Sequence, residues 1–196
     1  PLLKIYLAFI KSCQLKNGTF INYIAHKDKN PTLQNMHEDI EDSHARAQWA
    51  LAEILSNTNL PDKVRNDAKS MFLKYLNSHT VLTHMRAKAF MIEAFDLALP
   101  WISKDQFDLK NAIQEYAASL ERELLKSSIK SWRWFENRLN YNNAILPESL
   151  ITAGKVLHNK KYFTDGILTL NFLVEKTFSQ NMYLPIGHTN WYKNNE

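Results

Sequence analysis

Apolar residues recur along most of this chain at the three- and four-residue spacing of an amphipathic helix. In the longest such segment the apolar stripe contains Ile113, Tyr116, Leu120 and Leu124. The pattern predicts about seven long helices, near residues 2–14, 43–56, 61–75, 81–99, 105–127, 147–158 and 162–178. Only four glycines and six prolines are present, too few for the many turns of an all-β sandwich. We therefore predict an all-α fold, with residues 26–41 as a polar loop.

Three of the predicted helices are each followed by a short aromatic segment, at residues 19–23, 132–136 and 181–188. The first two segments precede a polar loop and a helix with an acidic start. The unit recurs after roughly 50 residues, a period typical of solenoid and toroid repeats. Helical hairpins of this kind must stack on neighbours to bury both faces. The sequence therefore predicts a single α/α-toroid domain over residues 1–196, of the six-hairpin type, with the aromatic connections at one rim.

The number of helices predicts that this toroid is partial. About seven helices make three and a half hairpins, whereas a closed six-hairpin toroid needs twelve helices. No methionine precedes Pro1, and no partner helix follows the last aromatic segment. We expect a piece of a longer protein whose last helix exposes an apolar edge around Ile167, Leu170 and Leu173. Such an edge predicts self-association.

Charge and composition exclude several classes of partner. The net charge of +4 is small, and lysine and arginine are scattered, which argues against nucleic-acid binding. No apolar run reaches the length of a membrane-spanning helix. The single cysteine, Cys13, excludes an intrachain disulfide and suits a reducing compartment, so we predict a cytoplasmic location. No glycine-rich phosphate loop is present, and we predict no cofactor.

Residues 41–51, Glu-Asp-Ser-His-Ala-Arg-Ala-Gln-Trp-Ala-Leu, concentrate titratable groups at the start of a predicted helix. Asp42 or Ser43 can cap the free amides of the first turn, where acidic residues also suit the helix dipole. Asp42 and Arg46 lie one helical turn apart, so we predict that they pair. The simpler interpretation is a well-capped helix beside a solvated acidic loop.

This segment, with Phe-Ile-Asn-Tyr at 20–23, resembles the Glu-Asp-Ser-His-Gly-Arg-Ala-Leu-Trp-Ala-Leu signature of an α/α-toroid family. The family occurs in bacterial proteins commonly labelled glycosyltransferases. Trp-Phe-Glu at 134–136 with Tyr-Asn-Asn-Ala-Ile-Leu-Pro-Glu at 141–148 is similar to its second signature, and residues 187–192 to its third. Ala45 stands where the family has glycine, and Gln48 where it has leucine. The resemblance implies a carbohydrate-active domain, of glycosyltransferase or glycoside hydrolase type, with a glycosyltransferase domain or protein as partner.

Aromatic faces stack on sugars, and carboxylates and amides bind their hydroxyl groups. Glycoside cleavage in most families needs two carboxylates, and the candidates here are Asp42, Glu136 and Glu148, each at or before the start of a predicted return helix. Glu136, beside Trp134, has the more apolar surroundings and is the predicted proton donor. The candidate sugar-binding residues are Tyr23, His44, Arg46, Trp134, Tyr141, Asn142, His188, Asn190 and Trp191. We predict that these residues converge on one concave rim.

Other interpretations of the same residues stay open. The domain can be a non-catalytic glycan-binding or partner-docking scaffold, with Trp134 as a core anchor and Glu148 placed for the helix dipole. A lipid-binding or terpene-cyclase-like toroid is a third class, although its funnel should be apolar. Residues 37–44 hold several potential metal ligands. We predict no metal site, because they lack a His-Glu-x-x-His pattern, a nearby cysteine and an EF-hand loop.

Overall fold

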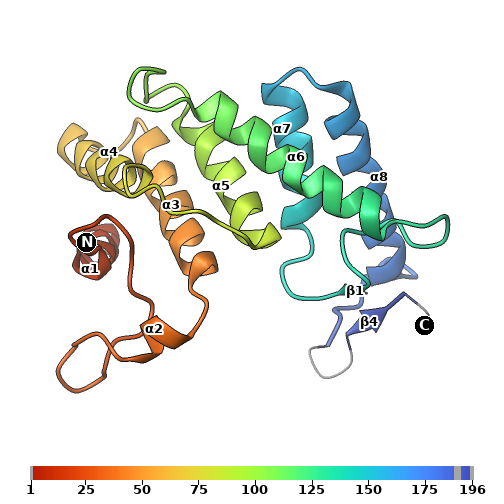
Figure 1. Cartoon of the computed structure of the whole chain (residues 1–196), viewed down its shortest axis with the longest axis horizontal. Coiled ribbons are helices and arrows are strands. Elements are labelled where there is room, and N and C mark those ends of the chain that lie inside the picture. Colours follow the sequence, from red (N-terminus) through yellow and green to blue (C-terminus); the bar gives the residue numbers. More distant parts are fainter. Residues whose placement is uncertain (1, 188–190, 195–196) are drawn as a thin grey trace. The chain divides into compact units, whose positions relative to one another are not determined.

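The computed structural model describes residues 2–187 and 191–194 (Figure 1). Its helices are α1 (Leu2–Cys13), α2 (Gln34–His37), α3 (Glu41–Ser56), α4 (Asp62–Leu76), α5 (Met85–Ala98), α6 (Leu109–Ser127), α7 (Ile145–Val156) and α8 (Lys160–Thr177). Its strands are β1 (Arg138–Leu139), β2 (Phe178–Ser179), β3 (Met182–Tyr183) and β4 (Tyr192–Lys193). The all-α prediction is confirmed for the described residues. None of their helices is long and apolar enough to span a membrane.

The seven predicted long helices are all present, but some details differ from the prediction. Residues 26–41 include the short helix α2 as well as loop. The predicted helix starts at 81 and 105 are wrong, since α5 begins at Met85 and α6 at Leu109. Phe107 donates its backbone amide to the carbonyl of Ser103, and this turn separates the two helices. An extended segment thus replaces the predicted first turn of α5, and a separate turn replaces that of α6.

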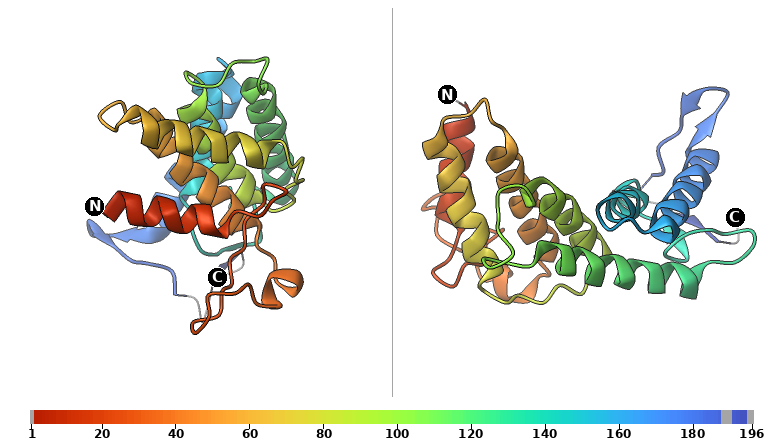
Figure 2. Two further views of the ribbon diagram at one scale, coloured as in Figure 1. Left: turned by 90° about the vertical axis from the view of Figure 1, so that its left-hand side faces the viewer. Right: turned by 90° about the horizontal axis from the view of Figure 1, so that it is seen from above.

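The chain forms two compact units, Pro1–Leu109 and Lys110–Glu196. In the N-terminal unit, α3 packs against both α4 and α5 (Figure 2). Small side chains on α5, including the wholly buried Ala87 and Ala94, allow α3 to approach closely. Phe72 of α4 and Phe95 of α5 meet edge to face in the core, with ring centroids 6.4 Å apart. Burial of such rings stabilises this unit.

The turn after α1 is held against α4 by polar contacts. Gln14 Nε2 donates to the carbonyls of Met71 (2.8 Å) and Gly18 (3.0 Å), and Lys74 Nζ donates to the carbonyl of Leu15 (2.8 Å). Gly18 has φ +98°, and a Cβ there would lie 2.2 Å from the carbonyl oxygen of Lys74. Glycine is therefore required at this turn both for its backbone conformation and for the close approach.

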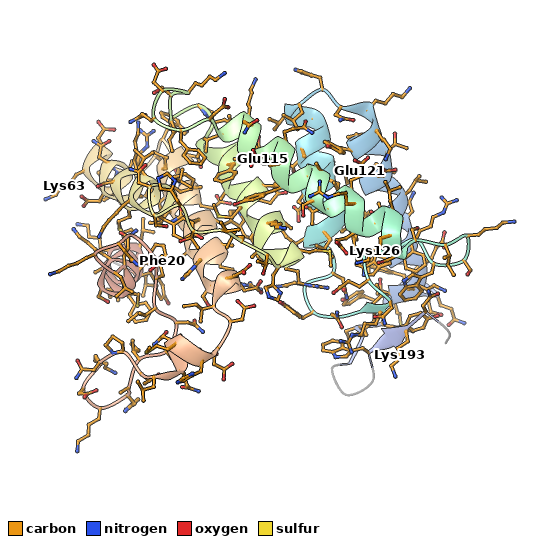
Figure 3. The ribbon with its side chains drawn as sticks, in the orientation of Figure 1. Phe20, Lys63, Glu115, Glu121, Lys126 and Lys193 are labelled. Carbon is orange, nitrogen blue, oxygen red and sulfur yellow. The ribbon has the colours of Figure 1, made fainter. Side chains whose placement is uncertain are left out.

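In the C-terminal unit, α7 and α8 form a hairpin and lie side by side in Figures 1 and 2. Asn159 caps α8 by accepting hydrogen bonds from the amides of Lys161 (2.9 Å) and Tyr162 (3.2 Å). Lys161 also forms ion pairs with Glu121 of α6, which is labelled in Figure 3, and with Asp165. The start of α8 is thus fixed by its own cap and by α6.

The end of α8 continues into short strands. β2 pairs with β3 in an antiparallel hairpin, and β1 pairs antiparallel with β4. Gln180 and Asn181 connect β2 to β3 with φ of +49° and +64°, as a two-residue type I′ turn requires. The predicted apolar edge of α8 is exposed at Ile167, whereas Leu173 is buried against the rest of the unit.

Candidate functional site

The acidic start of α3 holds a neighbouring helix in place. The Glu41 carboxylate accepts hydrogen bonds from the Thr83 amide (2.7 Å), the Thr83 hydroxyl (2.7 Å) and the His84 amide (2.8 Å). These groups directly precede α5, so Glu41 supplies the side-chain cap that α5 lacks within its own segment. Residues 83 and 84 are therefore not part of the helix, which explains its late start at Met85.

The prediction that Asp42 or Ser43 caps α3 is wrong. The helix begins at Glu41, and its N-cap residue Ile40 makes no side-chain hydrogen bond. Asp39 Oδ1 instead accepts from the Glu41 amide at 2.9 Å. Asp42 and Ser43 lie inside the first turn because Asp39 and Glu41 together set the start of the helix.

The predicted pair of Asp42 and Arg46 is present, with Oδ2 and the terminal guanidinium nitrogen 3.8 Å apart. The Arg46 guanidinium lies over the Phe90 ring, 4.3 Å from its centroid. Phe90 in turn stacks on Trp49, with centroids 5.6 Å apart. Arg46 is thus held by one charge and one aromatic face, and both side chains of the pair keep solvent contact.

His44 connects the two predicted motif segments, residues 20–23 and 41–51. Its ring is only 6% exposed, and Nε2 donates to the Phe20 carbonyl at 2.9 Å. The rings of Phe20, labelled in Figure 3, and Tyr75 pack against it, with centroids 6.3 and 5.6 Å away. Nδ1 is buried and has no hydrogen-bond partner among the described residues. His44 therefore anchors the structure in the core and is closed to a ligand.

Burial lowers the pKa of His44, and the Phe20 carbonyl and the carboxylates of Glu41 and Asp39 oppose this shift. Below about pH 6.5 the unfolded imidazole takes up a proton, whereas the buried ring stays neutral. The unfolded state then binds more protons, so the free energy of unfolding should fall between pH 7 and pH 5.

Urea denaturation at both pH values tests this expectation in the wild type and in His44→Gln. The glutamine amide can still donate to Phe20 but does not titrate. The free energy of unfolding of the variant should therefore depend less on pH than that of the wild type. The exposed histidines are the same in both proteins, so they do not account for this difference. An equal loss of stability in the two proteins would show that His44 is not responsible.

A side chain of α2 holds the backbone of Tyr23, the remaining predicted residue of the N-terminal unit. Asn35 of α2 accepts a hydrogen bond from the Tyr23 amide through Oδ1 (2.9 Å) and donates one to the Tyr23 carbonyl through Nδ2 (2.6 Å).

Three potential metal ligands, from Asp39, Glu41 and His84, lie within 4.8 Å of one another. Residues 37–44 alone do not reveal this grouping, because His84 lies outside them. The Glu41 carboxylate already caps α5, and Asp39 Oδ2 lies 2.5 Å from His84 Nε2. We assign no metal to these groups.

In the C-terminal unit, Trp134 lies in the core. It is 0% exposed and packs on Phe172 and Phe135, with centroids 6.2 and 5.4 Å apart. Its faces are therefore not open to a sugar. The carboxylate of Glu136 accepts a hydrogen bond from Asn140 Nδ2 at 3.1 Å, and Glu148 is exposed in the first turn of α7.

The described residues of the C-terminal unit enclose a cavity of about 650 Å³. We call it the aromatic cavity. It brings together the predicted residues Tyr141, Asn142 and Trp191 with the last turns of α8 and the β2–β3 hairpin. Its lining is aromatic, amide-bearing and aliphatic, and comprises Asn140, Tyr141, Asn142, Asn143, Ala144, Leu170, Leu173, Val174, Thr177, Phe178, Tyr183, Pro185, Ile186, Gly187 and Trp191.

A tight turn presents Asn142 in this lining. Asn143 Oδ1 accepts from the Asn140 amide (2.9 Å), and Asn143 Nδ2 donates to the Asn140 carbonyl (2.7 Å). Asn142 lies between them at φ +46°, a left-handed conformation that asparagine tolerates better than most residues. Its side-chain amide makes no hydrogen bond within the described chain. The turn thus leaves at the cavity one side-chain amide that is not hydrogen-bonded to the described residues.

The β2–β3 hairpin supplies an aromatic pair that was not among the predicted site residues. Phe178 and Tyr183 are cross-strand partners, with ring centroids 5.4 Å apart. Both side chains are exposed and line the cavity. The connecting dipeptide Gln-Asn is a weaker indication of a hairpin turn than Asn-Gly.

Part of the predicted site lies elsewhere or outside the described residues. Tyr23, Asp42, His44 and Arg46 belong to the N-terminal unit. His188 and Asn190 lie outside the described residues. The single rim that joins all of these groups therefore stays a prediction.

Comparisons with models of known families, with curated proteins and with solved structures found no match to this chain. The resemblance to the α/α-toroid family stays a prediction. A functional assignment therefore has to rest on the geometry of the aromatic cavity.

Proposed function

We propose that the C-terminal unit binds a glycan in the aromatic cavity. Sugars present C–H faces that stack on aromatic rings, and Tyr141, Tyr183, Phe178 and Trp191 supply such rings. The Asn142 amide can both donate to and accept from sugar hydroxyls. The volume of about 650 Å³ lies within the range of roughly 300–1,000 Å³ usual for small-molecule sites. The combination of open aromatic faces with an unused amide carries the proposal.

Binding without cleavage is the favoured form of this proposal. The lining residues that the structure describes include no aspartate or glutamate. Most glycosidases need two carboxylates at the scissile bond. Glu136 is not part of the described lining, and its Oε1 accepts a hydrogen bond from the lining residue Asn140. Enzymatic processing, with Glu136 and Glu148 as the acidic groups, is the second candidate.

The α/α toroid remains part of the proposal as the architecture that would carry this cavity. The α7–α8 hairpin and the packing of α3 on α4 and α5 support it, since stacked helical hairpins are the unit of such folds. In a toroid the connections of successive hairpins emerge at the same rim. An association with a glycosyltransferase domain would place bound glycan beside that enzyme.

A glycan array probed with the chain, followed by calorimetric titration of each hit, tests the proposed binding. Trp191→Ala and Tyr141→Ala should each raise the dissociation constant about tenfold. One aromatic stacking contact contributes roughly 0.5–1.5 kcal/mol in addition to the burial of apolar surface. Tyr6→Ala is the matched control, since Tyr6 is similarly exposed (61% against 49% for Tyr141) but lies on α1. Absence of any glycan ligand, or equal losses in all three variants, would contradict the proposal.

A further inference from the structure

The described lining of the aromatic cavity carries no charged side chain. It contains no lysine, arginine, histidine, aspartate or glutamate, although 22% of the chain is charged. Its described polar groups are asparagine amides, tyrosine hydroxyls, the Trp191 indole N–H, backbone, and a Thr177 hydroxyl that already donates to the Leu173 carbonyl. Such groups can replace the water around a sugar hydroxyl, but they provide no counter-charge for an anion.

A second hollow on α8 shows that this neutrality is local. It has a volume of about 340 Å³ and is lined by Lys130, Ser131, Arg133, Leu168, Asn171, Phe172, Glu175 and Lys176. We call it the basic hollow, because it holds three cations against one carboxylate. The Lys176 ammonium lies over the rings of Phe172 and Tyr192, 5.6 and 5.3 Å from their centroids. Helix α8 thus lines the basic hollow with Glu175 and Lys176, whereas its residues in the described lining of the aromatic cavity are uncharged.

A charged substituent would be disfavoured in the aromatic cavity. Moving a carboxylate or sulfate out of water is costly unless a cation or several donors compensate it. The Asn143 side-chain amide already hydrogen-bonds to the Asn140 backbone through both its oxygen and its nitrogen. The Asn142 amide nitrogen can donate to an anion. The oxygen of the same amide is partly negative, however, and would repel the anion. A neutral hydroxyl can use both ends of the same amide.

We infer that the aromatic cavity selects uncharged glycans, built from neutral hexoses without carboxylate, sulfate or phosphate groups. This inference rests on the proposed glycan binding and adds the class of sugar. Binding should also be insensitive to salt, since the described lining offers no charged side chain whose contact with the sugar salt could screen.

Matched ligands provide the test. Tetrasaccharides of glucose and of mannose are titrated calorimetrically into the chain, each beside its counterpart with C6 oxidised to the carboxylate. The methyl ester of each uronate keeps the shape and removes the charge. We expect the neutral form to bind at least about tenfold more tightly than the uronate, and the ester to restore most of the affinity. The dissociation constant of the neutral form should change less than about twofold between 50 and 500 mM NaCl.

The possible outcomes separate this inference from the proposed function. If the uronates bind as tightly as the neutral sugars and Trp191→Ala weakens both, glycan binding stands and the selection for neutral sugars is wrong. If only the uronates bind, and Lys130→Gln with Arg133→Gln removes that binding while Trp191→Ala does not, the basic hollow is the glycan site and the inference fails. If neither form binds, the proposed function and the inference fail together.

Discussion

Gly154→Ala should destabilise the C-terminal unit by about 3 kcal/mol, although it adds a single methyl group. A Cβ at Gly154 would lie 2.5 Å from the backbone nitrogen of Phe163 and 2.8 Å from its Cα and Cβ. The obstacle is backbone of α8, which cannot move without separating the two helices. In an unobstructed helix the same change would stabilise by about 1 kcal/mol, so the expected sign is reversed. Since α8 lines the aromatic cavity, the variant should also bind glycan less tightly.

Urea denaturation of the variant beside Gly187→Ala measures this effect. No atom lies within 4 Å of a Cβ built at Gly187, so the free energy of unfolding should change by less than about 0.5 kcal/mol. Gly166→Ala provides a second test, because its Cβ would lie 2.7 Å from Ile151 Cγ1 and 2.9 Å from the Pro147 carbonyl oxygen. A Gly154→Ala protein as stable as the wild type would show that α7 and α8 do not pack this closely.

Trp134→Ala should reduce the free energy of unfolding by about 3–5 kcal/mol, the usual range for removing a fully buried indole. Trp134→Phe should have a much smaller effect. Phenylalanine retains an aromatic contact with Phe172 and also removes an indole N–H that is buried without a hydrogen-bond partner among the described residues.

Thermal denaturation and glycan titration of both variants distinguish a core anchor from a sugar platform. As a core anchor, Trp134 can be replaced by phenylalanine with glycan affinity retained within about twofold. A Trp134→Phe protein that unfolds like the wild type but binds as weakly as Trp191→Ala would place Trp134 at the sugar.

The local helical structure was predictable because it depends on neighbours in the chain. Apolar residues at helical spacing located the seven long helices, and the spacing of Asp42 and Arg46 predicted their ion pair. The start of α5 was not predictable in this way. It depends on Glu41, which lies 42 residues before Thr83 and meets it only in the folded chain. Capping by a distant side chain leaves no pattern within the capped segment.

The aromatic cavity was predictable in part, for a related reason. Tyr141, Asn142 and Trp191 were chosen as aromatic and amide residues in predicted connections, and the structure brings them together. Phe178 and Tyr183 join them because the left-handed turn at Gln180 and Asn181 folds β3 back onto β2. The same chemical criterion also selected Trp134, which is buried. Residue type alone does not separate an aromatic ring in the core from one at an opening.

Periodicity and composition by themselves determined that this chain folds into amphipathic helices with aromatic connections, since both depend on residues a few positions apart. The tertiary structure decided which polar groups are free for a ligand. It commits Glu41 to α5 and His44 to the Phe20 carbonyl, and it leaves the Asn142 amide beside exposed rings. A polar side chain can bind a ligand only if no other part of the protein uses its hydrogen bonds, and that depends on contacts between residues far apart in the sequence.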